Sequence, residues 1–188
     1  MTCRLVLLAT LWSLAAVPAH AFQASGEAAA TGTVSFAFTP DGDAAALVIK
    51  AIDGARHQVL VQAFSFTHSD IARALVRAHR RGIDVRVIAD PEQIELIRHN
   101  VVGMVAAAGV PVFTDAAHAA AHDKVMVVDV EGDRPAVVTG SFNFTHAAQY
   151  RNAENVLVLS GNRPLAQAYR DNWNRHRAHA TPWRRYGH

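Results

Sequence analysis

Cysteine and lysine are both scarce in this 188-residue chain, and each scarcity narrows what the protein can be. The one cysteine, Cys3, lies near the start of the chain. If the first residues are removed by cleavage, the remaining chain has no thiol, no disulfide and no cysteine-based metal site. Of the 18 basic side chains only Lys50 and Lys124 are lysines, and the other 16 are arginines. The compact ammonium of Lys124 therefore departs from the preference of this chain for arginine, although chance explains a single lysine equally well.

Long hydrophobic runs are also lacking, apart from one near the N-terminus. The run Leu5–Val17 has 13 residues, fewer than the roughly 20 that a helix needs to cross a bilayer core. Arg4 precedes it as the only charge, and the small-residue pattern Ala19-His20-Ala21 follows. This arrangement predicts an export signal over residues 1–21, cleaved before Phe22, and a periplasmic or secreted protein. A retained membrane anchor is the alternative.

Removal of residues 1–21 would leave 167 residues with 17 basic and 16 acidic side chains, so the overall charge says little about partners. We expect a flexible lead-in over residues 22–32 and a single domain over residues 33–188, a length that can bury a full-sized core. The C-terminal part is basic and aromatic, and could lie along a polyanion. Alternatively, it is a helix that packs its aromatic residues on the core and solvates its arginines. The residues concerned are Arg163, Arg170, Arg175, Arg177, Arg184 and Arg185, with Trp173, Trp183 and Tyr186.

Alternating strand and helix patterns dominate the first half of the domain. Strands are predicted over residues 34–38, 57–66, 83–89 and 110–113, with helices over 43–55, 71–81 and 92–108; Asp43 caps the first helix, and Ser69 or Asp70 the second. The second half predicts strands over 124–130, 136–140 and 155–160 and a final helix over 164–179. We therefore expect an α/β fold, with a mixed, largely parallel β-sheet sandwiched between helices.

His122 and Lys124 stand at the start of an apolar run, Val125-Met126-Val127-Val128, which is typical of a strand buried on both faces. Residues two apart in an extended chain point the same way, so the imidazole and the ammonium leave the backbone together. Asp129 would point to the opposite face of a regular strand. We expect it to support the site or an interface.

Two further patterns offer polar groups that suit a phosphate. Ser141 and Asn143, behind Gly140, supply a hydroxyl and an amide that can hold non-bridging oxygens. Glu154 stands just before an apolar strand, where a carboxylate could orient an imidazole. Each pattern alone is weak, because the first also fits a capped turn and the second a solvent-exposed acid.

Taken together, His122-Asp123-Lys124, four apolar residues, Asp129 and then Gly140-Ser141-Phe142-Asn143 resemble a known motif. It is the H-x-K-x4-D motif, with its downstream G-S-x-N, of the phospholipase D superfamily. The stretch 121–158, with Asn152-Ala153-Glu154-Asn155, is similar to small bacterial endonucleases of that superfamily that carry one motif per chain. Ten residues separate Asp129 from Gly140, a longer gap than is usual, because the loop 131–135 is extended.

The resemblance implies a phospholipase D/nuclease-like fold and a two-step, metal-independent phosphoryl transfer. His122 would attack phosphorus to form a phosphohistidine, and a second histidine would protonate the leaving oxygen. In-line displacement needs these groups on opposite sides of phosphorus. The resemblance therefore implies a homodimer in which His122 of each copy faces the other. Lys124, Ser141 and Asn143 would neutralise the phosphate, and Glu154 would orient His122. His118 and His146 are alternative acids.

A catalytic metal is the rival chemistry, because the chain has 11 histidines. They show no H-E-x-x-H or comparable ligand spacing. His118 and His122 are four apart, but such a pair needs a helix, and Lys124 would repel a cation. We expect neither a catalytic metal nor another cofactor.

The substrate is less constrained than the chemistry. The resemblance and the arginine-rich C-terminal part favour a non-specific endonuclease acting on DNA, or on RNA, through backbone contacts. A phospholipase D or cardiolipin hydrolase is the second hypothesis, although no basic amphipathic helix is evident. A non-catalytic nucleic-acid-binding protein is the third, and the complete set of motif residues argues against it.

Overall fold

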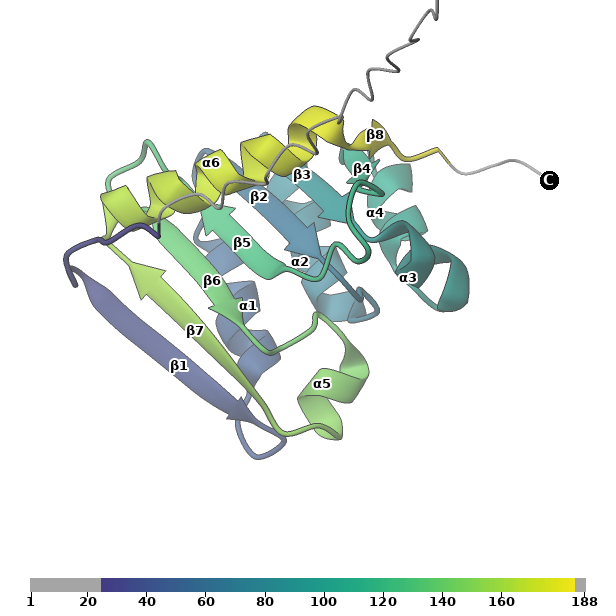
Figure 1. The fold of residues 1–188 in the computed structure, drawn as a ribbon. Helices are drawn as coiled ribbons and strands as arrows, with labels where there is room; N and C mark the ends of the chain where they lie inside the picture. The colour runs from purple at the N-terminus through teal and green to yellow at the C-terminus, as the bar shows by residue number, and fades with distance from the viewer. Residues whose placement is uncertain (1–24, 185–188) are drawn as a thin grey trace, which may run out of the picture.

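The computed structural model describes residues 25–184, so the predicted export signal and the last four residues, with Arg185 and Tyr186, lie outside the described part. Eight strands form one sheet in the order β1-β7-β6-β5-β2-β3-β4-β8 (Figure 1). The strands are β1 (Thr33–Thr39), β2 (Gln58–Ala63), β3 (Asp84–Ala89), β4 (Val112–Thr114), β5 (Lys124–Val128), β6 (Ala136–Gly140), β7 (Glu154–Ser160) and β8 (Thr181–Pro182). The helices are α1 (Ala44–Asp53), α2 (Ser69–Arg80), α3 (Pro91–Leu96), α4 (Val102–Ala107), α5 (His146–Tyr150) and α6 (Arg163–His179).

The sheet is mixed, as expected, but the expectation that it is largely parallel is wrong. Among the strands of residues 25–184, the pairs β2/β3 and β3/β4 are parallel and the other five neighbouring pairs are antiparallel. The parallel pairs lie where a helix crosses between strands. The strands β5 and β6 are joined by a short loop, and such hairpins bring strands together antiparallel.

Helices cover both faces of the sheet (Figure 1). The core on one face lies under α1, α2 and α4, and includes Met126 and Val128. The core on the other face lies under α6, and includes Val125 and Val127. All five residues of β5 are buried, which confirms the prediction of a strand covered on both faces.

Helix ends differ from the expectations in three places. The helix predicted over 92–108 is wrong as a single element: it is divided into α3 and α4, because Ile97 is extended and the Asn100 amide donates to the carbonyls of Ile94 and Ile97. Neither Ser69 nor Asp70 caps α2, since the helix begins at Ser69 behind His68. Helix α5 was not predicted at all. Asp43 does cap α1, accepting from Ala46 N at 2.8 Å.

The packing alternative for the C-terminal part is confirmed for Trp173. Its side chain is 1% exposed on α6, and its Nε1 donates to Val61 O at 3.0 Å. Arg163 donates to the carbonyls of Val130 and Gly132 at 2.6 and 2.7 Å, and Arg170 pairs with Glu131. These arginines therefore hold the extended loop 131–135 against α6. A role along a polyanion stays a prediction for the exposed Arg175 and Arg184.

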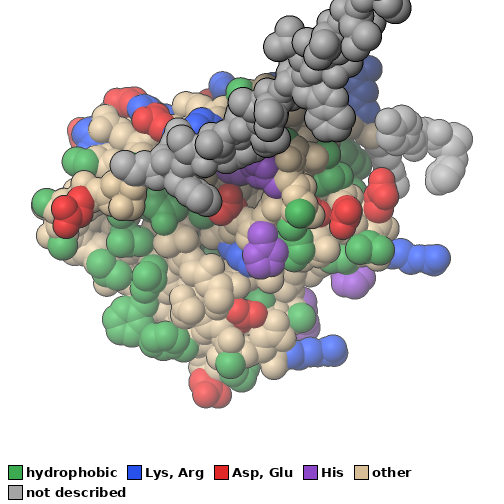
Figure 2. All heavy atoms as spheres, in the orientation of Figure 1, with side chains coloured by type: hydrophobic (Ala, Val, Ile, Leu, Met, Phe, Trp, Pro, Cys, Tyr) green, Lys and Arg blue, Asp and Glu red, His purple; other side chains and the backbone are tan. Residues whose placement is uncertain are grey.

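Within residues 25–184, one apolar strip of the sheet is left uncovered. Val34, Phe36 and Phe38 alternate along the edge strand β1 and are 56, 64 and 62% exposed. Figure 2 shows hydrophobic side chains gathered over this part of the fold. In residues 25–184, no helix is long and apolar enough to cross a membrane.

Candidate active site

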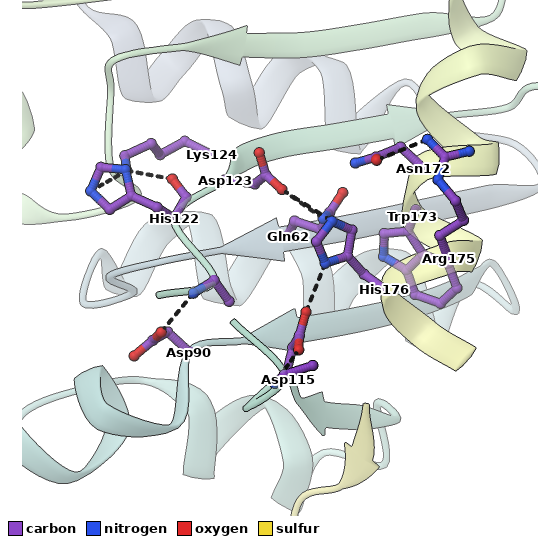
Figure 3. Close-up of polar contacts among 12 residues, drawn as sticks. Gln62, Asp90, Asp115, His122, Asp123, Lys124, Asn172, Trp173, Arg175 and His176 are labelled. Atoms are coloured by element: carbon purple, nitrogen blue, oxygen red, sulfur yellow. Dashed lines mark hydrogen bonds and ion pairs between the residues drawn. The ribbon is translucent and has the colours of Figure 1, made fainter. Parts of the chain in front are cut away.

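An imidazole and an ammonium meet where β5 begins. Lys124 Nζ lies 3.1 Å from His122 Nδ1 and 3.2 Å from Nε2, and donates to His122 O at 2.6 Å (Figure 3). The His122 side chain is exposed, whereas Lys124 is 9% exposed. The ring of Phe64 lies under both, 4.3 Å from the imidazole centroid and 4.7 Å from Nζ. The predicted pair therefore shares one face, with the imidazole presented to solvent.

Neighbouring segments fix the backbone of this pair. Lys124 lies opposite Ala63 in the antiparallel register of β5 and β2, and Phe64 N donates to Asp123 O at 3.0 Å. Asp90 is 3% exposed and accepts from Ala121 N at 2.9 Å, just before the histidine. Asp123 points away from the pair and accepts from the Gln62 amide at 2.9 Å. The backbone that carries the imidazole is thus held by the start of β5, by the end of β2 and by Asp90, which directly follows β3.

Burial sets the charge balance of Lys124. Loss of solvent lowers the pKa of its ammonium below the ordinary lysine value, and the negative charges of Asp123 and Glu154 oppose this shift. An ammonium that has lost part of its hydration interacts more strongly with an anion that comes beside it. This suits Lys124 to hold a phosphate oxygen.

The sheet register brings the G-S-x-N segment to the same edge. Because Met126 pairs with Val138, extension of this register places Gly140 beside Lys124. Gly140 has φ +152°, and a Cβ there would lie 2.3 Å from Asn155 O, so only glycine fits. The Phe142 that follows is buried and donates from its N to that same oxygen at 3.1 Å. The glycine is thus required by a close approach of β6 to β7.

Ser141 and Asn143 keep hydrogen-bonding capacity for a ligand. Ser141 Oγ accepts from Asn155 N at 3.0 Å and from its Nδ2 at 3.3 Å, so its own O–H is free to point elsewhere. Asn143 Oδ1 is buried without a hydrogen-bond partner among the described residues. Buried polar atoms are normally paired, so this unpaired oxygen would suit a donor on a bound molecule, whereas the amide nitrogen is the atom that can donate to a phosphate oxygen.

Glu154 reaches the edge but does not bond to His122. It begins β7, opposite Thr39 of β1, and its Oε1 accepts from the Asn152 amide at 2.9 Å. Its negative charge favours the protonated form of Lys124 and so opposes the lowering of the lysine pKa by burial. The predicted role of orienting His122 therefore stays a prediction, and the carboxylate acts on the ammonium in this structure.

Asp129 lies at the other end of β5 from His122. It has φ +48°, so the strand stops before it, and its carboxylate accepts from the backbone N–H groups of Arg56, His57 and Gln58 at 2.8 Å each. Three such bonds fix the chain where β2 begins. The structure therefore places this motif residue in a supporting position, away from the reacting groups.

The alternative acids are engaged elsewhere. The ring of His146 stacks on Tyr150 at 4.3 Å, and the ring of His118 packs against His176 and His179. In the described part of the chain, neither ring packs against that of His122, whose ring neighbour is Phe64. Sequence reasoning missed Phe64, Asp90 and Asn155 as parts of the site, because their contacts join segments far apart in sequence.

Comparison with known proteins agrees with this geometry. The family model described as "Cardiolipin synthase, PLD-like domain" matches residues 48–177. The chain belongs to the phospholipase D superfamily. A phospholipase D of Rickettsia felis is 36% identical over 140 residues, which are 74% of this chain and 67% of that protein. The mitochondrial cardiolipin hydrolase of Mus musculus is 32% identical over 112 residues, 60% of this chain and 48% of the relative.

Solved structures point the same way. The phospholipase D family member Nuc from Salmonella typhimurium superposes with a TM-score of 0.75 at 36% identity, over 81% of this chain and 99% of that one. NucT from Helicobacter pylori shares the fold, with a TM-score of 0.71 at 24% identity over 80% of this chain and 99% of that one. The chain is thus a phosphodiesterase of the phospholipase D superfamily, of the type that carries a single motif.

Proposed function

We propose that the chain is a metal-independent endonuclease of low sequence specificity, which cleaves nucleic-acid phosphodiesters through a phosphohistidine at a homodimer interface. The observation that carries this proposal is the exposed imidazole of His122 beside the buried ammonium of Lys124. A phosphate held by Lys124 Nζ would place its phosphorus within reach of a ring nitrogen. The O–H of Ser141 and the amide of Asn143 would then face its other oxygens.

The chemistry needs two steps and two imidazoles. In the first, a ring nitrogen of His122 bonds to phosphorus while the bond to the leaving oxygen breaks, and that oxygen takes a proton. In the second, water attacks the phosphohistidine, gives up a proton and frees the ring. The proton donor must stand on the far side of phosphorus from the nucleophile. Since His118 and His146 are engaged elsewhere, we assign this role to His122 of the partner subunit.

Nucleic acid is the substrate we propose, because the similar Salmonella chain is named Nuc and is matched over almost its whole length. Arg175 and Arg184, exposed on α6 and beyond it, could follow a phosphate backbone. A phospholipid headgroup is the second candidate. It is favoured by the names of the Rickettsia and mouse relatives and by the exposed Phe36 and Phe38, which could rest on a membrane surface.

Parallel assays on DNA and lipid separate these candidates. Purified protein is incubated with supercoiled plasmid and with cardiolipin or phosphatidylcholine vesicles, each in excess chelator. We expect plasmid nicking that persists in chelator, vanishes in His122→Ala and is retained in His99→Ala, a matched change of an exposed histidine. Lipid turnover without nicking would establish the second candidate. Binding of DNA without turnover of either would refute both enzymatic proposals.

The covalent step has its own test. Protein quenched in alkaline denaturant during turnover of a ³²P-labelled oligonucleotide should carry labelled phosphorus on the peptide containing His122. That phosphorus should still be esterified to one strand fragment, because only one of its two ester bonds has broken, and the bond from phosphorus to histidine survives base and not acid. The same peptide from Ser141→Ala, which keeps the nucleophile, should still be labelled. Turnover without any labelled peptide would contradict the mechanism.

We also propose that residues 1–21 direct export, so that the enzyme works in the periplasm or outside the cell. The proposal predicts a mature N-terminus at Phe22. Mass spectrometry of protein recovered from the periplasmic and membrane fractions measures this directly, and a full-length chain held in the membrane would show a retained anchor instead.

A further inference from the structure

Three histidines and an aspartate lie close together between the end of α6 and the loop that leads to His122. Asp115 follows β4, His118 lies in the loop that leads to β5, and His176 and His179 lie one turn apart near the end of α6. One ligand atom from each of the four lies within 4.8 Å of the other three. The three ring centroids are 5.0, 5.2 and 5.6 Å apart, close to an equilateral triangle. Figure 3 shows His176 of this group directed from α6 toward Asp115.

The aspartate is held as a fixed ligand would be. Asp115 is 0% exposed, and its Oδ1 accepts from Ala117 N at 3.0 Å. Its Oδ2 is thereby turned to the histidines, 2.7 Å from His176 Nδ1 and 3.1 Å from His179 Nε2. The Asp115 carboxylate thus already faces two of the imidazole rings that would share an ion with it.

From this geometry we propose that Asp115, His118, His176 and His179 bind one divalent transition metal ion, with zinc as the reference ion. Three imidazole nitrogens and one carboxylate oxygen make a donor set that zinc accepts, in the four-coordinate arrangement of structural sites. Bonds of 2.0–2.1 Å place tetrahedral donor atoms about 3.3 Å apart. The separation between Asp115 Oδ2 and His176 Nδ1, 2.7 Å, has to widen by about 0.6 Å to reach this spacing. His118 and His179 are exposed, so their rings can turn and an ion can enter from solvent.

The position of the cluster indicates a structural role next to the catalytic pair. It ties the end of α6 to the loop 115–123, which leads directly to His122. The outer nitrogen of His176 lies 3.8 Å from Asp123 Oδ2, and Asp123 stands between His122 and Lys124 in the chain. His122 and Lys124 themselves lie outside the cluster, so the metal takes no part in phosphoryl transfer. The site is thus independent of the proposed nuclease mechanism.

Zinc titration of tag-free protein tests the proposal. We expect one zinc per chain with a dissociation constant in the micromolar range or below, and tetrahedral absorption bands when cobalt replaces zinc. We also expect a higher melting temperature with zinc than in chelator. His118→Ala is the first variant, because the His118 ring makes no hydrogen bond within residues 25–184 that the substitution would remove. It should weaken zinc binding by about 10- to 100-fold or more.

Matched variants keep the result interpretable. His179→Ala should behave as His118→Ala does, while His99→Ala, an exposed histidine outside the cluster, should bind zinc as the unaltered chain does. His122→Ala should also retain the zinc site while losing phosphodiesterase activity. The proposal is overturned if zinc, cobalt and nickel show no saturable binding, if the double variant of His118 and His179 still binds one zinc, or if His122→Ala removes it.

Discussion

The Lys124 ammonium lies closer to the backbone oxygen of His122, at 2.6 Å, than to either nitrogen of its ring, at 3.1 and 3.2 Å. The backbone oxygen of His122 therefore fixes the ammonium group of Lys124 beside the imidazole. Replacement by methionine keeps an unbranched side chain one atom shorter than that of lysine and removes the charge.

Lys124→Met should lower kcat about 10²- to 10³-fold, the range seen when one donor to a developing oxyanion is lost. Lys124→Arg should restore little of this activity. Lys124 is 9% exposed, so its surroundings leave no room for the larger, planar guanidinium group. Steady-state rates on a chromogenic phosphodiester, with circular dichroism to show unchanged folding, measure the effect. Full activity in Lys124→Met would remove the lysine from the mechanism.

Titration of Lys124 itself is accessible because the chain has only two lysines. With ¹³C at the lysine ε position, the spectrum should hold two signals, and Lys124→Met identifies which belongs to Lys124. Since burial lowers the pKa of this ammonium, its signal should move at lower pH than that of a free lysine. Activity should fall as pH rises through the same value, because the neutral amine no longer attracts the phosphate.

Gly140→Ala should damage both stability and activity. The new methyl group would meet Asn155 O at 2.3 Å, so β7 must shift, and with it the amide that contacts Ser141. We expect a loss of about 3 kcal/mol, the upper end for strained backbone positions. Gly82→Ala is the control, because Gly82 also has a positive φ, at +86°, but faces open space. It should cost about 1–2 kcal/mol and leave kcat unchanged.

His68 should make the fold sensitive to acid. It is 5% exposed, and neither ring nitrogen has a partner among the described residues. Burial lowers its pKa below 6.5, with the charges of Asp70, His146, Asp43 and Arg73 as smaller influences of both signs. Between the lowered pKa and pH 6.5, His68 is therefore mostly protonated in the unfolded chain and mostly neutral in the folded chain. This contribution is absent above pH 6.5 and destabilises the fold as pH falls from there to the lowered value.

His68→Phe should flatten the fall of the melting temperature below pH 6.5, because it removes the group whose protonation favours unfolding. His99→Phe, at an exposed position, should leave the slope as it is. Thermal melts at a series of pH values give both slopes. Equal slopes for the unaltered chain and His68→Phe would mean that another group sets the acid limit.

Subunit mixing measures whether one active centre needs two copies of His122. If both copies act together, an equal mixture of unaltered and His122→Ala chains should keep about a quarter of its activity after random exchange of a two-fold dimer. A self-sufficient monomer would keep half. Light scattering of the same samples gives the mass.

Much of the site was predictable because its signals are local. The apolar run after Lys124 predicted a strand buried on both faces, and the spacing of His122 and Lys124 predicted a shared face; both are seen. The supporting role of Asp129 was predicted, but the end of the strand was not. The strand ends before Asp129 because this residue has a positive φ, which the alternation of side chains in the sequence does not reveal.

Contacts between distant segments could not be read from the sequence. The division between α3 and α4 depends on Asn100 and on a hydrogen bond from Val101 N to Phe66 O, which joins segments separated by α2, β3 and α3 in the sequence. Strand direction depends on which strands become neighbours, so the parallel character was overestimated. The histidine cluster was missed because Asp115 and His176 are 61 residues apart and match no ligand spacing.

Helix α6 is anchored along its whole length: by Arg163 and Arg170 on the loop 131–135, by Trp173 in the middle, and by His176 and His179 at its end. Fraying at one end leaves the other anchors closed, so its central amides should exchange with deuterium only when the whole domain opens. The helix is thus fixed to the sheet at several points, and the slowest-exchanging amides of the protein should include those that flank Trp173.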